Sequence, residues 1–98
     1  MDRRSQLGKL PGDELVDQGI KDLERGIESQ ESLLVSIGAP RLGRLGIAVP
    51  DPFDSPEHRL YALLSAEHGD AAHSRYNALV RRLVSFERAA GMAGAGRA

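Results

Sequence analysis

The sequence predicts an all-α fold, a compact four-helix bundle with a kinked second helix and a long C-terminal helix. Aromatic residues make up only 4% of the 98 residues, so Leu, Ile, Val and Ala must form most of the core. These residues, together with a charged fraction of 28%, favour helices. Apolar residues also recur at spacings of three and four, as on one face of a helix.

A chain of this length fits one domain. We expect 1–12 to form a flexible N-terminal arm, 13–90 a single helical domain, and 91–98 a flexible tail rich in Gly and Ala. Cysteine is absent, which excludes disulfides, thiol nucleophiles and cysteine-ligated zinc. No apolar run is long enough to cross a membrane, and the net charge of −1 does not favour a dedicated duplex-binding protein. We therefore expect a cytoplasmic location.

The first helix is expected to begin with Asp13 as its N-cap, where Glu14 in the first turn suits the positive end of the helix dipole. One apolar stripe follows at helical spacing and consists of Val16, Ile20, Leu23 and Ile27. Gly26 is expected to weaken the end of this helix.

Ser29 is expected to cap the second helix, and its apolar side begins with Leu33, Leu34 and Ile37. Proline lacks a backbone donor and disfavours helical geometry in the residue before it. Pro40 therefore predicts a kink, or two short helices joined near Gly38–Pro40. Gly46 is the expected stop of this segment.

Two prolines prevent a helix over 47–54, and three apolar side chains of this loop are expected to fold back on the core: Ile47, Val49 and Phe53. The third helix has the clearest start signal, with Ser55 as N-cap and Pro56 at the first helical position. Its buried side is expected to consist of Leu60, Leu63 and Leu64, and Gly69 to end it.

The last helix is predicted from about Asp70 to Ala90. Its apolar stripe alternates steps of four and three residues and consists of Ala72, Tyr76, Leu79, Leu83, Phe86 and Ala90. Val80 and Val84 widen this stripe beyond a single seam, which indicates a second contact surface on the helix.

Four polar residues near the start of this helix raise the question of a metal or hydrolase-like site: Glu67, His68, Asp70 and His73. Two histidines that bind one ion from a helix are commonly four residues apart, whereas His68 and His73 are five apart with Gly69 between them. We favour a structural interpretation in which Gly69 ends one helix and Asp70 caps the next. The alternative is a metal-binding protein that uses His68, Asp70 and His73.

The charge of the chain is polarised. Acidic residues dominate 13–31, whereas the last helix carries Arg75, Arg81, Arg82 and Arg88 against Glu87. This polarity would draw the first and last helices together within one chain or between two chains. A second alternative is nucleic-acid binding through these four arginines, although the nearby acidic helix weakens it.

The "GRLG" stretch at 43–46 matches the bare pattern of a KH loop, with Arg41 and Arg44 placed to meet phosphates. KH domains need strands around this loop, and the sequence predicts none. We therefore interpret both arginines as residues at a helix C-terminus, where positive charge is favoured.

We predict a non-enzymatic protein–protein interaction module without a cofactor. Its partner would be a second copy, as a homodimer, or a larger protein of bacterial type. Arg82 and Glu87 are five apart, the spacing of pairs between the helices of a parallel coiled coil. The predicted interaction residues are Tyr76, Leu79, Val80, Leu83, Phe86, Arg75, Arg82 and Glu87.

Overall fold

The computed structural model describes residues 10–93 and is all-helical over that range, with no strand in this part of the chain. The helices are α1 (Asp13–Glu24), α2 (Gln30–Arg44), α3 (Pro56–His68) and α4 (Ala72–Ala93), with a short 3₁₀ turn, η2 (Gly69–Ala71), between α3 and α4. The predicted all-α class is confirmed. The arm at 1–9 and the end of the tail at 94–98 lie outside the described residues.

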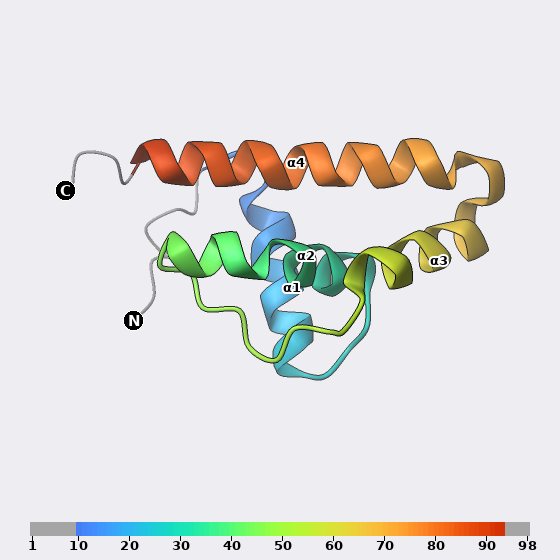
Figure 1. Cartoon of the computed structure of the whole chain (residues 1–98), viewed down its shortest axis with the longest axis horizontal. Coiled ribbons are helices and arrows are strands. Elements are labelled where there is room, and N and C mark those ends of the chain that lie inside the picture. Colours follow the sequence, from blue (N-terminus) through green and yellow to red (C-terminus); the bar gives the residue numbers. More distant parts are fainter. Residues whose placement is uncertain (1–9, 94–98) are drawn as a thin grey trace.

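The arrangement of the helices bears on the compact four-helix bundle that the sequence predicted. Figure 1 shows α4 along one side of the molecule, α2 and α3 following one another beneath it, and α1 crossing steeply to α4. The molecule measures 44 × 25 × 19 Å. The finer prediction of a bundle is therefore not confirmed.

One continuous core joins all four helices. Its buried aliphatic and aromatic side chains are Leu15, Val16, Ile20, Leu23, Leu33, Leu34, Val35, Leu42, Ile47, Leu60, Leu64, Ala72, Leu83, Phe86 and Ala90. The apolar stripe of α1 is thus confirmed up to Leu23. Ile27 was wrongly included, because α1 ends at Glu24 and Gly26 turns the chain with φ 70°, which leaves Ile27 44% exposed.

The start of α1 differs from the prediction. Asp13 is the first helical residue and does not cap the helix; Gly12 occupies the N-cap position with φ 82°. This backbone conformation is easily reached only by glycine. The missing side chain also allows close approach to α4, because a Cβ on Gly12 would lie 3.1 Å from the Arg82 carbonyl oxygen and 3.4 Å from Phe86 Cβ.

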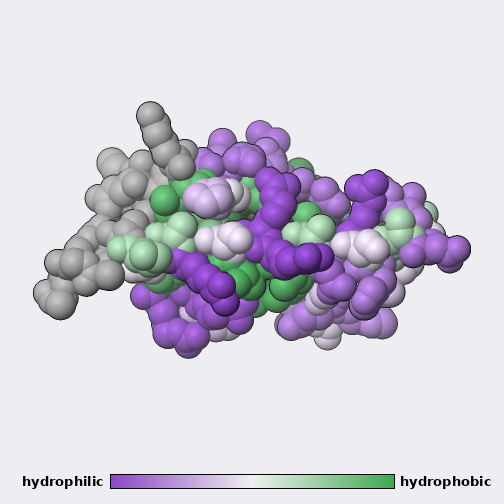
Figure 2. Space-filling view, turned by 90° about the horizontal axis from the view of Figure 1, so that it is seen from above, coloured by the Kyte–Doolittle hydropathy of each residue, from purple (hydrophilic) through white to green (hydrophobic). Residues whose placement is uncertain are grey.

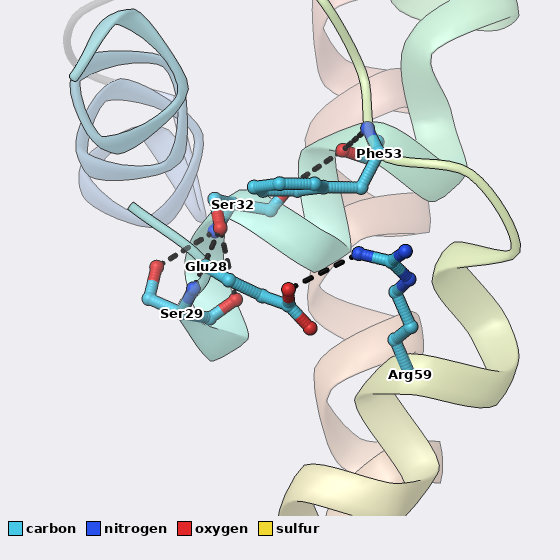
Figure 3. A network of polar contacts seen from close by, with 6 residues as sticks. Glu28, Ser29, Ser32, Phe53 and Arg59 are labelled. Atoms are coloured by element: carbon cyan, nitrogen blue, oxygen red, sulfur yellow. Dashed lines mark hydrogen bonds and ion pairs between the residues drawn. The ribbon is translucent and has the colours of Figure 1, made fainter. Parts of the chain in front are cut away.

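The predicted cap of α2 is confirmed. The Ser32 amide donates to Ser29 Oγ (3.1 Å), and the Ser29 amide donates to Ser32 Oγ (2.7 Å), so two otherwise unpaired donors are satisfied (Figure 3). Ser29 Oγ also donates to Asp22 Oδ2 (2.6 Å), which ties this cap to the end of α1.

The predicted division of the second helix is wrong, because α2 runs without interruption through Pro40 to Arg44. Pro40 lies on the exposed side, while Gly38 and Leu42 on either side of it are buried. Packing of this buried side outweighs the loss of one backbone hydrogen bond. The kink at Pro40 stays a prediction.

The loop at 47–54 folds back on the core as predicted. Ile47 is fully buried, and Val49 and Phe53 pack against the core. The Phe53 amide donates to Ser36 Oγ (3.0 Å), and the Arg59 guanidinium lies 5.6 Å from the Phe53 ring centre. Figure 3 shows how these contacts, with the ion pair between Arg59 and Glu28 (3.1 Å), connect the start of α2 to α3.

The start of α3 at Pro56 is confirmed, but Ser55 does not cap it with its side chain. Ser55 adopts a left-handed conformation (φ 48°, ψ 50°), and its hydroxyl makes no cap hydrogen bond. Ser55 therefore occupies the predicted N-cap position, but the side-chain bond is missing because such a bond normally requires an extended N-cap residue.

Gly69 ends α3 as predicted, with φ 56°. Asp70 does not cap the next helix: it lies exposed in η2, which has no side-chain cap hydrogen bond, and α4 begins at Ala72. From there α4 continues past Ala90 to Ala93. This long helix confirms the most regular pattern in the sequence.

Candidate interaction surface

Two of the predicted interaction residues belong to the core of their own chain. Leu83 and Phe86 are each 1% exposed. The glycines opposite them permit this close packing, because a Cβ on Gly38 would lie 3.1 Å from Leu83, and one on Gly12 would lie 3.4 Å from Phe86. A partner therefore cannot reach these two side chains while the chain is folded.

The charged residues predicted to pair between two chains instead pair within one chain. Arg82 Nη2 lies 2.9 Å from Glu14 Oε1, which links α4 to α1. Glu87 Oε1 accepts from Arg41 Nε (2.8 Å), which links α4 to α2. In a parallel coiled coil, Arg82 and Glu87 would each have to share these groups with a partner in the second chain.

The electrostatics of these pairs follow from their surroundings. The backbone amide of Glu14, and then Asp13 and Arg82, lower the pKa of the Glu14 carboxyl. The hydrogen bond to Glu87 raises the pKa of the Arg41 guanidinium. Both shifts favour the charged form of the group concerned.

The polar cluster at the α3–α4 turn does not assemble a metal site. His68 Nε2 lies 3.8 Å from Glu67 Oε1, whereas His73 Nε2 lies 3.2 Å from the Asn77 amide nitrogen. Within residues 10–93, no three or more His, Cys, Asp or Glu side chains are grouped so that they could hold a metal ion. The structure thus gives the alternative of His68, Asp70 and His73 no convergent ligand set.

The four arginines considered for nucleic-acid binding face different surroundings. Arg82 pairs with Glu14, and Arg81 Nε donates to the Asn77 carbonyl (3.4 Å). Arg75 lines two cavities beside the start of α2, and Arg88 lines another beside its end. Arg82 shares one cavity with Arg75 and another with Arg81, whereas Arg88 lines a separate pocket, so no cavity brings all four arginines together.

One flank of α4 carries apolar side chains that residues 10–93 leave partly exposed. The Tyr61 ring from α3 is 41% exposed and lies 5.7 Å from the Tyr76 ring. Val80 and Val84 follow Tyr76 at intervals of four residues, so they lie on the same flank, and both are partly exposed. We call these four residues the tyrosine face.

The ends of this flank differ in charge. At the tyrosine end the charged neighbour is the Glu57 carboxylate. Burial, and then this carboxylate, raise the pKa of the Tyr76 hydroxyl. At the other end lies a cavity of about 290 Å³, which we call the arginine pocket; its lining residues are Arg41, Arg44, Leu45, Glu87 and Arg88.

The opposite flank of α4 borders two cavities with mixed polar and apolar lining. Leu79 and Arg75 line a cavity of about 240 Å³ with Gln30 of α2. A neighbouring cavity of about 500 Å³ brings Arg75 beside Glu28 and Glu31. These two predicted interaction residues, Leu79 and Arg75, thus lie away from the tyrosine face.

Sequence reasoning identified Tyr76 and Val80 but missed Tyr61 and the arginine pocket. Tyr61 stands beside the apolar stripe of α3 rather than in it, and an exposed aromatic residue of this kind is a signal that could have been followed. Arg41 and Arg88 are brought to one pocket only by the packing of α2 on α4.

Comparisons with protein families, with curated proteins and with solved structures find no match. Within the described part of the chain, no helix combines the length and the apolar character needed to cross a membrane.

Proposed function

We propose that this protein is a non-enzymatic interaction module that self-associates through the tyrosine face. The observation that carries the proposal is the pair of contacting rings of Tyr61 and Tyr76, partly exposed beside Val80 and Val84. Tyrosine is enriched at the energetically important positions of protein interfaces, where its ring is desolvated while its hydroxyl keeps a polar partner.

A second copy of the chain is the partner that the charges favour. Glu57 lies at the tyrosine end of the flank, while Arg44 and Arg88 lie at the other end. A two-fold axis near Val84 would place each acidic end against the basic end of the other copy. The pairing is therefore antiparallel, in contrast to the parallel coil considered from the sequence.

The side of the molecule that carries α4 mixes apolar and polar surface. Figure 2, which looks onto the side of the molecule that carries α4, shows hydrophobic surface in separate patches between hydrophilic ones. Interfaces of this kind are typical of weak, reversible association. In such a dimer the α3–α4 pairs of the two copies would lie against one another. A cytoplasmic, bacterial setting remains part of this proposal.

Charge exchange tests the proposal. Glu57→Arg gives both ends positive charge, and Arg44→Glu with Arg88→Glu gives both ends negative charge. Each change should raise the dissociation constant about tenfold, measured by sedimentation equilibrium at low salt. The triple variant, which combines Glu57→Arg with Arg44→Glu and Arg88→Glu, exchanges the charges of the two ends and should restore the wild-type dissociation constant.

Glu24→Arg with Arg25→Glu, at the exposed end of α1, is the matched control and should leave association unchanged. Far-UV circular dichroism checks that every variant remains helical. A wild-type chain that stays monomeric at millimolar concentration, or a triple variant as weak as the single-end variants, would refute antiparallel self-association.

A further inference from the structure

The arginine pocket brings together guanidinium groups from two helices. Arg41 and Arg44 come from the last turn of α2, and Arg88 comes from α4. Positive side chains in the last turn of a helix offset its partial negative charge, which explains the first two arginines. Arg88 belongs to a different helix and is not explained in this way.

Glu87 holds one of these guanidinium groups in place. Its side chain is only 10% exposed, and Oε1 accepts from Arg41 Nε at 2.8 Å. Gly38 makes room for the carboxylate, because a Cβ there would lie 3.0 Å from Glu87 Oε2. Since Arg41 uses Nε for this bond, its two terminal nitrogens stay available for a ligand. An arginine fixed in advance loses less conformational entropy on binding.

The pocket carries an excess of two positive charges, because three guanidinium groups surround one carboxylate. Arg44 and Arg88 make no ion pair with any residue in 10–93. Guanidinium groups bind phosphate oxygens through paired, charge-assisted hydrogen bonds. A phosphate monoester, which carries close to two negative charges at neutral pH, matches this excess, whereas a diester carries only one.

We propose that the arginine pocket binds the terminal phosphate of a monoester. Arg44 and Arg88 hold its oxygens, and Arg41 is positioned by Glu87 to add a further contact. The aliphatic Leu45 side chain forms an apolar part of the wall, against which the organic part of the ligand packs. Binding does not depend on self-association, although the same arginines face the second copy in the proposed dimer.

Phenyl phosphate is the probe, titrated into dilute, monomeric ¹⁵N-labelled protein and followed by amide chemical shifts. We expect saturable shifts at 41–46 and 87–91, and dimethyl phosphate, a diester model, to bind at least tenfold more weakly. Arg44→Ala with Arg88→Ala should weaken phenyl phosphate at least tenfold. Arg25→Ala with Arg75→Ala removes the same charge elsewhere and should change binding less than twofold.

Three results would overturn the proposal: shifts that do not saturate, equal weakening by the two double variants, or equal binding of the monoester and the diester. The last result would indicate recognition of a diester backbone such as that of a nucleic acid. Because Arg44 and Arg88 are exposed, the double variant should keep its helicity, which circular dichroism verifies.

Discussion

Gly19 is the position at which the packing of α1 on α2 can be tested by a single methyl group. A Cβ on Gly19 would overlap the Glu31 carbonyl oxygen, and it would lie 2.7 and 2.9 Å from the two methyl groups of Val35. The carbonyl belongs to the backbone of α2, so it cannot rotate away as a flexible side chain could. The two helices must therefore separate to admit the methyl group of Gly19→Ala.

The magnitude follows from two opposing effects. Replacing glycine by alanine inside a helix stabilises it by about 0.8–1.0 kcal/mol when nothing is in the way. Overpacking a tight interface costs about 1–3 kcal/mol and sometimes more. Because the contact here is with backbone, we expect the upper part of that range, and a net loss of about 1–2 kcal/mol for Gly19→Ala.

Gly43→Ala is the matched control, since a Cβ at Gly43 in α2 meets nothing within 4 Å. This variant should gain up to about 1 kcal/mol. Urea unfolding followed by far-UV circular dichroism measures both values, with the slope of the transition unchanged. If Gly19→Ala were stabilised as much as Gly43→Ala, α1 and α2 would not pack as closely as described.

Three further changes test the cap, the core and the tyrosine face. Ser29→Ala should cost about 1 kcal/mol in urea unfolding, because the Ser32 amide loses its acceptor; an unchanged midpoint would exclude a working cap. Phe86→Ala should cost about 3–5 kcal/mol, since this ring is 1% exposed, whereas a loss below 1 kcal/mol would place it outside the core. Tyr61→Phe leaves Tyr76 as the one tyrosine of the chain. Its ionisation, followed by ultraviolet absorbance, should occur at a higher pH than that of free tyrosine, because burial raises the pKa of Tyr76. The stability that comes from keeping Tyr76 neutral is fully present below the pKa of an unfolded tyrosine, and it is lost as pH rises through the pKa of Tyr76 in the folded chain. Ionisation at the pKa of free tyrosine would show that Tyr76 is not buried as described.

Local signals predicted those parts of the fold that depend on neighbouring residues. The apolar stripe of α4, the cap at Ser29 and the proline start at Pro56 were all found because their physical cause lies within a few residues. The caps predicted at Asp13 and Asp70 were wrong, because glycine conformations and a 3₁₀ turn, which composition does not specify, determine where α1 and α4 begin.

The candidate site could be predicted only in part. Tyr76 and Val80 follow from the width of the apolar band on α4, but Leu83 and Phe86 were assigned to a partner although their own chain covers them. Periodicity identifies an apolar side without specifying what covers it. The arginine pocket joins residues separated by more than forty positions, so its existence depends on the packing of α2 against α4.

Because the chain contains no cysteine, a single introduced thiol reports on contacts between copies without interference. Val84→Cys places a thiol beside the proposed two-fold axis, and Gln18→Cys places one on the exposed part of α1 as a control. Under mild oxidation, Val84→Cys should form a disulfide-linked dimer much faster than Gln18→Cys, as seen by non-reducing electrophoresis. Equal rates for the two variants, or a Val84→Cys chain that stays monomeric, would contradict association through this flank of α4.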